Sequence, residues 1–136
     1  MEIEVNKAKL EDIRKEHGLL LILLHGSQVN GRTHEKSDVD IAVLRKDKKS
    51  KLKLMELIRD LSVALGTDKV DLSDLTNADP LFLFVATKKA MLLSGKESDF
   101  EKLQKLAFHK YSDYLPFLKK EEEFVRQRIK NYVANR

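Results

Sequence analysis

A Gly-Ser pair and a pair of aspartates stand at a spacing suited to phosphate chemistry. Gly26-Ser27 follows an apolar run, and after ten intervening residues Asp38-Val39-Asp40 opens a second one. A tight Gly-Ser turn can offer backbone N–H groups and a hydroxyl to a phosphate. Residues two apart on a strand point to the same face, so Asp38 and Asp40 present their carboxylates together. Because Mg²⁺ takes hard oxygen ligands and shares them with substrate phosphates, the pattern predicts Mg²⁺-dependent nucleotidyl transfer.

A third carboxylate is needed to complete a metal site or to accept a proton from the attacking hydroxyl. Asp71 lies between Val70 and Leu72, and strand alternation puts it on the face opposite to both apolar neighbours. Asp74 is the competing candidate, but it lies three residues further on and is typical of a turn that ends a strand. We therefore expect Asp71 to be the third acid.

Strands and helices alternate along the part of the chain that carries these acids. Continuous apolar runs and short apolar segments predict four strands, at residues 19–24, 39–44, 69–73 and 91–93. Helical spacing of apolar residues, and an Asp79-Pro80 start signal, predict three helices, at residues 7–17, 50–65 and 81–89.

The order of these elements predicts an α/β fold with a small mixed β-sheet and flanking helices. The connection between the first two strands is too short for a helical crossover, so we expect them to be antiparallel. The third strand follows a helix, which favours a parallel arrangement with the second strand.

A C-terminal helical segment follows this α/β part. Apolar residues recur at steps of three and four between Phe100 and Val133, and Pro116 is expected to kink or divide the helix. We expect residues 1–95 to form the core and residues 96–136 to be a helical extension of the same domain. This extension either packs on the core or binds a partner.

The composition narrows the class of protein. With 136 residues the chain forms one domain, and its 35% of charged residues is typical of a soluble protein. No apolar run approaches the roughly 18 residues that a membrane-spanning helix needs. The absence of cysteine fits the cytoplasm, where we expect this protein. Basic residues are not interleaved with aromatic ones, so direct binding of nucleic acid is not expected.

The motifs resemble those of the nucleotidyltransferase superfamily that includes DNA polymerase β. The pattern LLHGS…SDVDIAVL, the helix after it and the VDL strand are similar to the minimal nucleotidyltransferases, the antitoxins of HEPN–MNT toxin–antitoxin pairs. The resemblance covers about residues 5–95 and implies the nucleotidyltransferase fold. It also implies that Gly26 and Ser27 bind the nucleotide. Three aspartates would then bind Mg²⁺ and act in catalysis: Asp38, Asp40 and Asp71.

The same resemblance implies a reaction and a partner. AMP would pass from ATP to a hydroxyl, expected to be a tyrosine, of a HEPN toxin with which the chain forms a hetero-oligomer. Many relatives have Phe before the Gly-Ser pair and arginines shortly after it. This chain has His25, Gln28 and Asn30 at those positions, with Arg32 nearby.

Two other functions remain open at the level of sequence. A small-molecule nucleotidyltransferase of the aminoglycoside type would need a second copy or a further helical part to enclose its substrate. A non-catalytic antitoxin would block its toxin by contact alone, although the intact Gly-Ser pair and acids favour catalysis. Among the other residues, His25 is expected to pack at a strand end, and Tyr111 and Tyr114 to lie in the core or at a docking surface.

Overall fold

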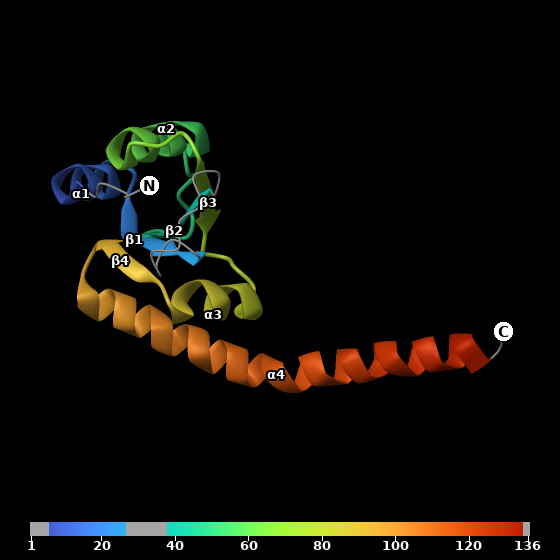
Figure 1. Cartoon of the computed structure of the whole chain (residues 1–136). Helices are drawn as coiled ribbons and strands as arrows, with labels where there is room; N and C mark the ends of the chain where they lie inside the picture. Colours follow the sequence, from blue (N-terminus) through green and yellow to red (C-terminus); the bar gives the residue numbers. More distant parts are fainter. Residues whose placement is uncertain (1–5, 27–37, 135–136) are drawn as a thin grey trace.

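The computed structural model describes residues 6–26 and 38–134, which form a sheet with helices on both faces (Figure 1). Its elements in chain order are α1 (Lys7–Glu16), β1 (Leu19–His25), β2 (Val39–Arg45), α2 (Leu54–Leu65), β3 (Val70–Asp74), α3 (Pro80–Lys88), β4 (Met91–Ser94) and α4 (Glu97–Ala134). The predicted α/β class is confirmed.

The four strands make one mixed sheet in the order β3-β2-β1-β4. β1 is antiparallel to both β2 and β4, whereas β2 and β3 are parallel. Both orientations predicted from the connections are therefore confirmed. The parallel pair is joined through α2, because a parallel connection must cross over the sheet.

Each face of the sheet has its own apolar core. Helices α1 and α2 cover one face, where Leu10 and Leu57 pack with Ile22 and Ile41. Helices α3 and α4 cover the other face, where side chains of the two helices pack with Leu21, Leu23 and Ala42: Leu83, Phe100 and Leu103. Strands β1 and β2 are buried on both faces, which explains their continuous apolar sequence.

The helix starts are set by local hydrogen bonds. Asp79 caps α3 by accepting a hydrogen bond from the Phe82 N–H at 2.9 Å, with Pro80 in the first helical position as predicted. Helix α2 begins at Leu54, so the prediction of a helix from Ser50 is wrong for the first four residues. The Ser50 hydroxyl and N–H both donate to the Asp47 carbonyl, which folds this segment into a turn.

Pro116 was predicted to kink or divide the helix, and α4 runs through it without a break, so the helix is not divided. Pro116 is exposed and so is Ser112, whose carbonyl loses its helical donor and remains open to water. Figure 1 shows the helix change direction partway along its length, as a proline favours.

None of the helices within residues 6–26 and 38–134 is both long enough and apolar enough to cross a membrane.

Candidate active site

Three polar side chains form a row across the sheet. His25 at the end of β1 pairs with Asp40 of β2, and Asp40 pairs in turn with Asp71 of β3. The alternation of strand residues puts Asp40 on the same face as Ala42, and therefore on the face covered by α3 and α4. The neighbours of Asp71, Val70 and Leu72, pack on the opposite face. The predicted juxtaposition of Asp71 with Asp40 is confirmed.

Asp40 lies at the centre of a concentration of negative charge. It is half-buried and lies opposite Asp71 in the paired strands. Burial raises the pKa of the Asp40 carboxyl; His25 opposes this rise, and the carboxylates of Asp71 and Asp38 add to it. Asp38 and Asp71 are exposed, so this group of acids is open to a ligand.

Gly26 leaves the room that the Asp40 carboxylate occupies. A Cβ at position 26 would overlap Asp40 Oδ2 and lie 3.2 Å from its Cγ, and the glycine has a φ of +79°. Both the space and the backbone conformation therefore require glycine. Ser27, the predicted partner of Gly26 in binding the nucleotide, lies outside the described residues, as does the connection 28–37 that contains Arg32.

His25 packs at the strand end, as predicted, and also faces the acids. Its ring meets the Phe82 ring edge-on, with 6.4 Å between centroids. Burial lowers the pKa of His25, although Asp40 and Asp71 oppose this effect. Burial thus favours the neutral form of the imidazole, and the two carboxylates favour its charged form. Its Nε2 is buried without a hydrogen-bond partner among the described residues.

A pocket of about 460 Å³ opens between α3 and α4 and reaches Gly26. Its walls include Phe84 and Tyr111, whose rings stack with centroids 4.4 Å apart and planes 14° apart. Lys88 lies 5.6 Å from the centre of the Phe84 ring. This volume is in the usual range for small-molecule sites. The sequence prediction placed Tyr111 in the core or at a docking surface and overlooked Phe84, because only tertiary packing brings the two rings together.

The acid group fits a divalent cation in its chemistry. All three side chains offer carboxylate oxygens, the donors that Mg²⁺ prefers. Asp40 lies opposite Asp71, and the carboxylates of Asp71 and Asp38 raise the pKa of Asp40, so the acids oppose the ionisation of this carboxyl. A bound cation would offset the repulsion between the carboxylates and so favour their ionised form.

Asp74, the competing candidate for the third acid, makes contacts that stabilise the fold. It accepts a salt bridge from Arg45 Nε at 2.9 Å and a hydrogen bond from the Thr76 hydroxyl at 2.6 Å. These contacts fix the turn after β3, which agrees with the prediction that Asp74 ends the strand.

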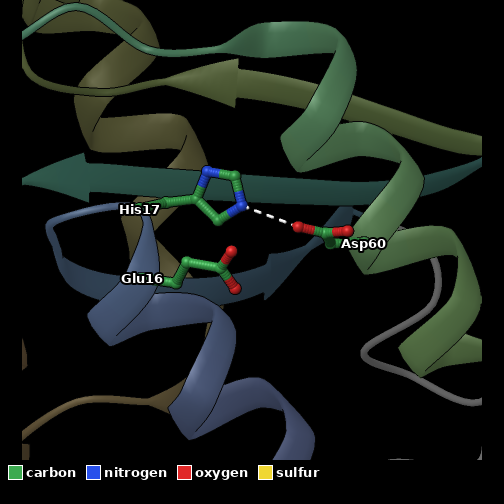
Figure 2. A group of neighbouring side chains, drawn as sticks. All are labelled: Glu16, His17 and Asp60. Atoms are coloured by element: carbon green, nitrogen blue, oxygen red, sulfur yellow. Dashed lines mark hydrogen bonds and ion pairs between the residues drawn. The ribbon is translucent and has the colours of Figure 1, made fainter.

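A second polar group lies between α1 and α2, on the opposite side of the sheet from the acids. Glu16, His17 and Asp60 have ligand atoms within 4.8 Å of one another, and their side chains point toward a common centre (Figure 2). His17 Nε2 lies 2.8 Å from Asp60 Oδ2, and the His17 side chain is only 6% exposed. This contact links the C-terminal end of α1, which His17 caps, to α2, and we assign it a role in stability.

Comparison with known proteins shows what the chain is similar to. Residues 8–99 match the family described as polymerase beta, nucleotidyltransferase. The protein adenylyltransferase MntA of Shewanella oneidensis is 34% identical over 100 residues, which are 72% of this chain and 71% of that protein.

Two solved structures are similar over nearly their whole length. A chain from a toxin–antitoxin complex with AMP-PNP has a TM-score of 0.70 and 28% identity, over 92% of this chain and 99% of that one. A chain from the complex of a tri-AMPylated Shewanella oneidensis HEPN toxin with MNT antitoxin has a TM-score of 0.64 and 25% identity. That match covers 91% of this chain and 96% of the other.

Proposed function

Because the chain belongs to the polymerase β nucleotidyltransferase family, we propose that it transfers AMP from ATP to a tyrosine hydroxyl of a HEPN toxin and acts as its antitoxin. The observation that carries this proposal is the group of Asp38, Asp40 and Asp71 beside Gly26, at the edge of a pocket. The relatives in toxin–antitoxin complexes support the partner, and the AMP-PNP complex supports ATP as the donor.

The proposed roles follow from where each group lies. Asp38, Asp40 and Asp71 would hold Mg²⁺, which would stabilise the charge that develops on the α-phosphate. The turn at Gly26 binds the triphosphate together with Ser27. The stacked wall of Phe84 and Tyr111 supplies an apolar surface for the rest of the nucleotide.

In the transfer itself, the acceptor oxygen forms a bond with the α-phosphorus on the side opposite to the leaving group. The bond from the α-phosphorus to the bridging oxygen breaks, and pyrophosphate leaves. Asp71 is exposed and adjacent to Asp40, so it is the group placed to accept the proton of the acceptor hydroxyl. AMP then remains attached to the toxin.

The proposal is tested with ATP labelled either on the α-phosphate or on the γ-phosphate, incubated with Mg²⁺, the chain and its cognate HEPN toxin. The expected result is transfer of the α-label alone, and its loss with the double substitution Asp38→Asn and Asp40→Asn. Transfer of the γ-label would identify a kinase instead. No transfer by a wild-type chain that binds the toxin would identify an antitoxin that acts by contact.

A further inference from the structure

A group of metal-ligating side chains lies between α1 and α2, away from the acids of the candidate active site. Glu16 and His17 come from the C-terminal end of α1 and Asp60 from α2, and Figure 2 shows the three side chains directed toward one centre. Their ligand atoms, one from each residue, lie within 4.8 Å of one another. The two helices cover the face of the sheet opposite to Asp40, so this group is separate from the acids.

The fold holds His17 and Asp60 in fixed places. His17 caps α1, and its N–H donates to the Ile13 carbonyl at 3.0 Å. Asp60 directly precedes Leu61, which is fully buried in the core. The His17 side chain is only 6% exposed, and its Nε2 points at Asp60 Oδ2 from 2.8 Å away. A buried imidazole nitrogen, the commonest protein ligand of metals, is therefore already aimed into the group.

Glu16 supplies a carboxylate that has no partner of its own. Its side chain makes no hydrogen bond or ion pair with any described residue, although Lys9 and Arg59 line the cavity that it borders. The carboxylates of Glu16 and Asp60 thus converge on one point, which favours a cation between them. The partial negative charge at the C-terminal end of α1 adds to this preference.

A cavity of about 290 Å³ opens beside the group. Glu16 and Asp60 line it, together with the apolar side chains of Ile13 and Val63. An ion can therefore reach the carboxylates without any opening of the apolar core. The cavity also leaves room for a water molecule on a bound ion.

The donor atoms select the class of ion. Mg²⁺ and Ca²⁺ take oxygen ligands, whereas one imidazole with two carboxylates suits Zn²⁺ and its neighbours among the transition metals. Bonds from zinc to nitrogen or oxygen are about 2.0–2.2 Å long, so two ligands of one tetrahedral ion lie roughly 3.3 Å apart. The separation of 2.8 Å between His17 Nε2 and Asp60 Oδ2 is near this spacing. Three protein ligands leave the fourth position of the ion to water.

From these observations we propose that Glu16, His17 and Asp60 form a zinc site that joins α1 to α2, with water as the fourth ligand. The ion binds the lone pair of His17 Nε2, and the ring proton then lies on Nδ1. Because the unfolded chain does not hold Asp60 beside the other two residues, bound zinc stabilises the folded state. The site is independent of the nucleotide and of the proposed function.

The test uses the full chain carrying Asp38→Asn and Asp40→Asn, because the carboxylates of the active site could also take zinc. On this background, Glu16→Gln removes one proposed ligand, and Asp12→Asn is the matched control. Asp12 lines the same cavity from the same helix and loses the same charge, but it lies outside the group. Calorimetry with Zn²⁺ alone measures the affinity, and thermal unfolding with and without Zn²⁺ measures the stabilisation.

We expect one zinc ion per chain. Its affinity should fall roughly 100-fold in Glu16→Gln, the upper end of what loss of an outer-shell partner costs a metal site, and stay unchanged in Asp12→Asn. At a free Zn²⁺ concentration about one hundred times the dissociation constant, Tm should rise by roughly 10 °C in the background chain and in Asp12→Asn. The same concentration should give Glu16→Gln only a small part of this rise.

Nitrogen NMR of the imidazole rings identifies the ligand directly. The chain has four histidines, and zinc should shift the ring resonances of His17 alone. Absence of zinc binding, equal affinity in Glu16→Gln and the background chain, or an equal loss in Asp12→Asn would overturn the proposal. Zinc bound without a shift of the His17 ring would overturn it as well. Because Glu16 is exposed and unpartnered among the described residues, its substitution tests a ligand rather than the fold.

Discussion

Among single residues, the close approach of Gly26 to Asp40 decides whether the acids can keep their arrangement. The space that a Cβ would need at position 26 is filled by the carboxylate of Asp40. Asp40 in turn lies opposite Asp71 in the paired strands β2 and β3. A substitution at Gly26, which carries no reactive group, therefore displaces Asp40 and through it affects Asp71.

Gly26→Ala is predicted to lower label transfer by roughly 100-fold, because displacing a reacting group by about 1 Å has an effect of this size. Gly66→Ala is the matched control. Gly66 also has a positive φ, +70°, but a Cβ there meets nothing within 4 Å. The control should lose about 1 kcal/mol of stability and keep its activity. Comparable activity of the two variants in the label assay would show that close approach to Asp40 is unimportant.

Asp71→Asn is predicted to lower the rate of transfer by roughly 100- to 10,000-fold, the usual effect of losing a general base. Asp74→Asn is the companion variant in the same strand. It should keep the rate but lose about 1–3 kcal/mol of unfolding free energy in urea titration, because it weakens the contact with Arg45. A reversed pattern, with activity lost only in Asp74→Asn, would make Asp74 the third acid.

The alternation of side chains along a strand allowed the acid group to be predicted from the sequence. Asp38 and Asp40 are two apart, and Asp71 stands between two apolar residues, so each had a defined face. The register that sets Asp71 opposite Asp40 depends on how α2 crosses the sheet, and single-strand patterns do not contain this information. The pairing of Phe84 with Tyr111 is likewise a product of helix packing.

Among the elements, polar contacts attach α1 to the end of the sheet. Glu11 accepts hydrogen bonds from Arg14 at 2.7 Å and from the Ser94 hydroxyl at 2.6 Å, and Arg14 Nε also donates to Ser94. The Gly95 N–H adds a further hydrogen bond to Glu11. This network joins the first helix to β4, two elements that are distant in the sequence.

The contacts of Glu11 predict a pH dependence of stability. The hydrogen bond from Arg14, followed by that from Ser94, lowers the pKa of Glu11 from 4.5 to about 2. A depressed pKa stabilises the folded state above 4.5, and this contribution is lost as the pH falls from 4.5 toward 2. Glu11→Gln should therefore remove about 1 kcal/mol at pH 7, a small amount because the Glu11 side chain is 41% exposed and solvent screens its charge. Thermal unfolding from pH 7 to pH 2.5 measures this, and equal pH slopes in variant and wild type would contradict it.

Most helices and strands could be predicted from the sequence because short local patterns mark them. Apolar runs identified β1 and β2, and the Asp79-Pro80 pair identified the start of α3. The predicted helix start at Ser50 was wrong, and Pro116, predicted to kink or divide α4, left the helix unbroken. The turn around Asp47 replaced the first turn of α2, and solvent exposure allowed α4 to tolerate a proline.

In the molecule as a whole, α4 has two parts with different surroundings. Part of its beginning is buried against the body, whereas residues 119–134 are all exposed. Sequence periodicity alone left open whether this helix packs internally or binds a partner, and the structure shows internal packing for its beginning.

Hydrogen exchange should separate the two parts of α4. In the free chain, amides of residues 117–134 are predicted to exchange with little protection, and those around Leu103 with strong protection, because local stability follows buried apolar contacts. Uniform protection along the whole helix in the free chain would contradict this division.

The central claim is that these acids attach AMP to a toxin tyrosine. Mass spectrometry of the cognate HEPN toxin, after incubation with ATP, Mg²⁺ and the chain, tests it most directly. The account predicts one or more added adenylates located on tyrosine by peptide mapping, and none with the chain carrying Asp38→Asn and Asp40→Asn. An unmodified toxin, or equal modification by the double variant, would contradict it.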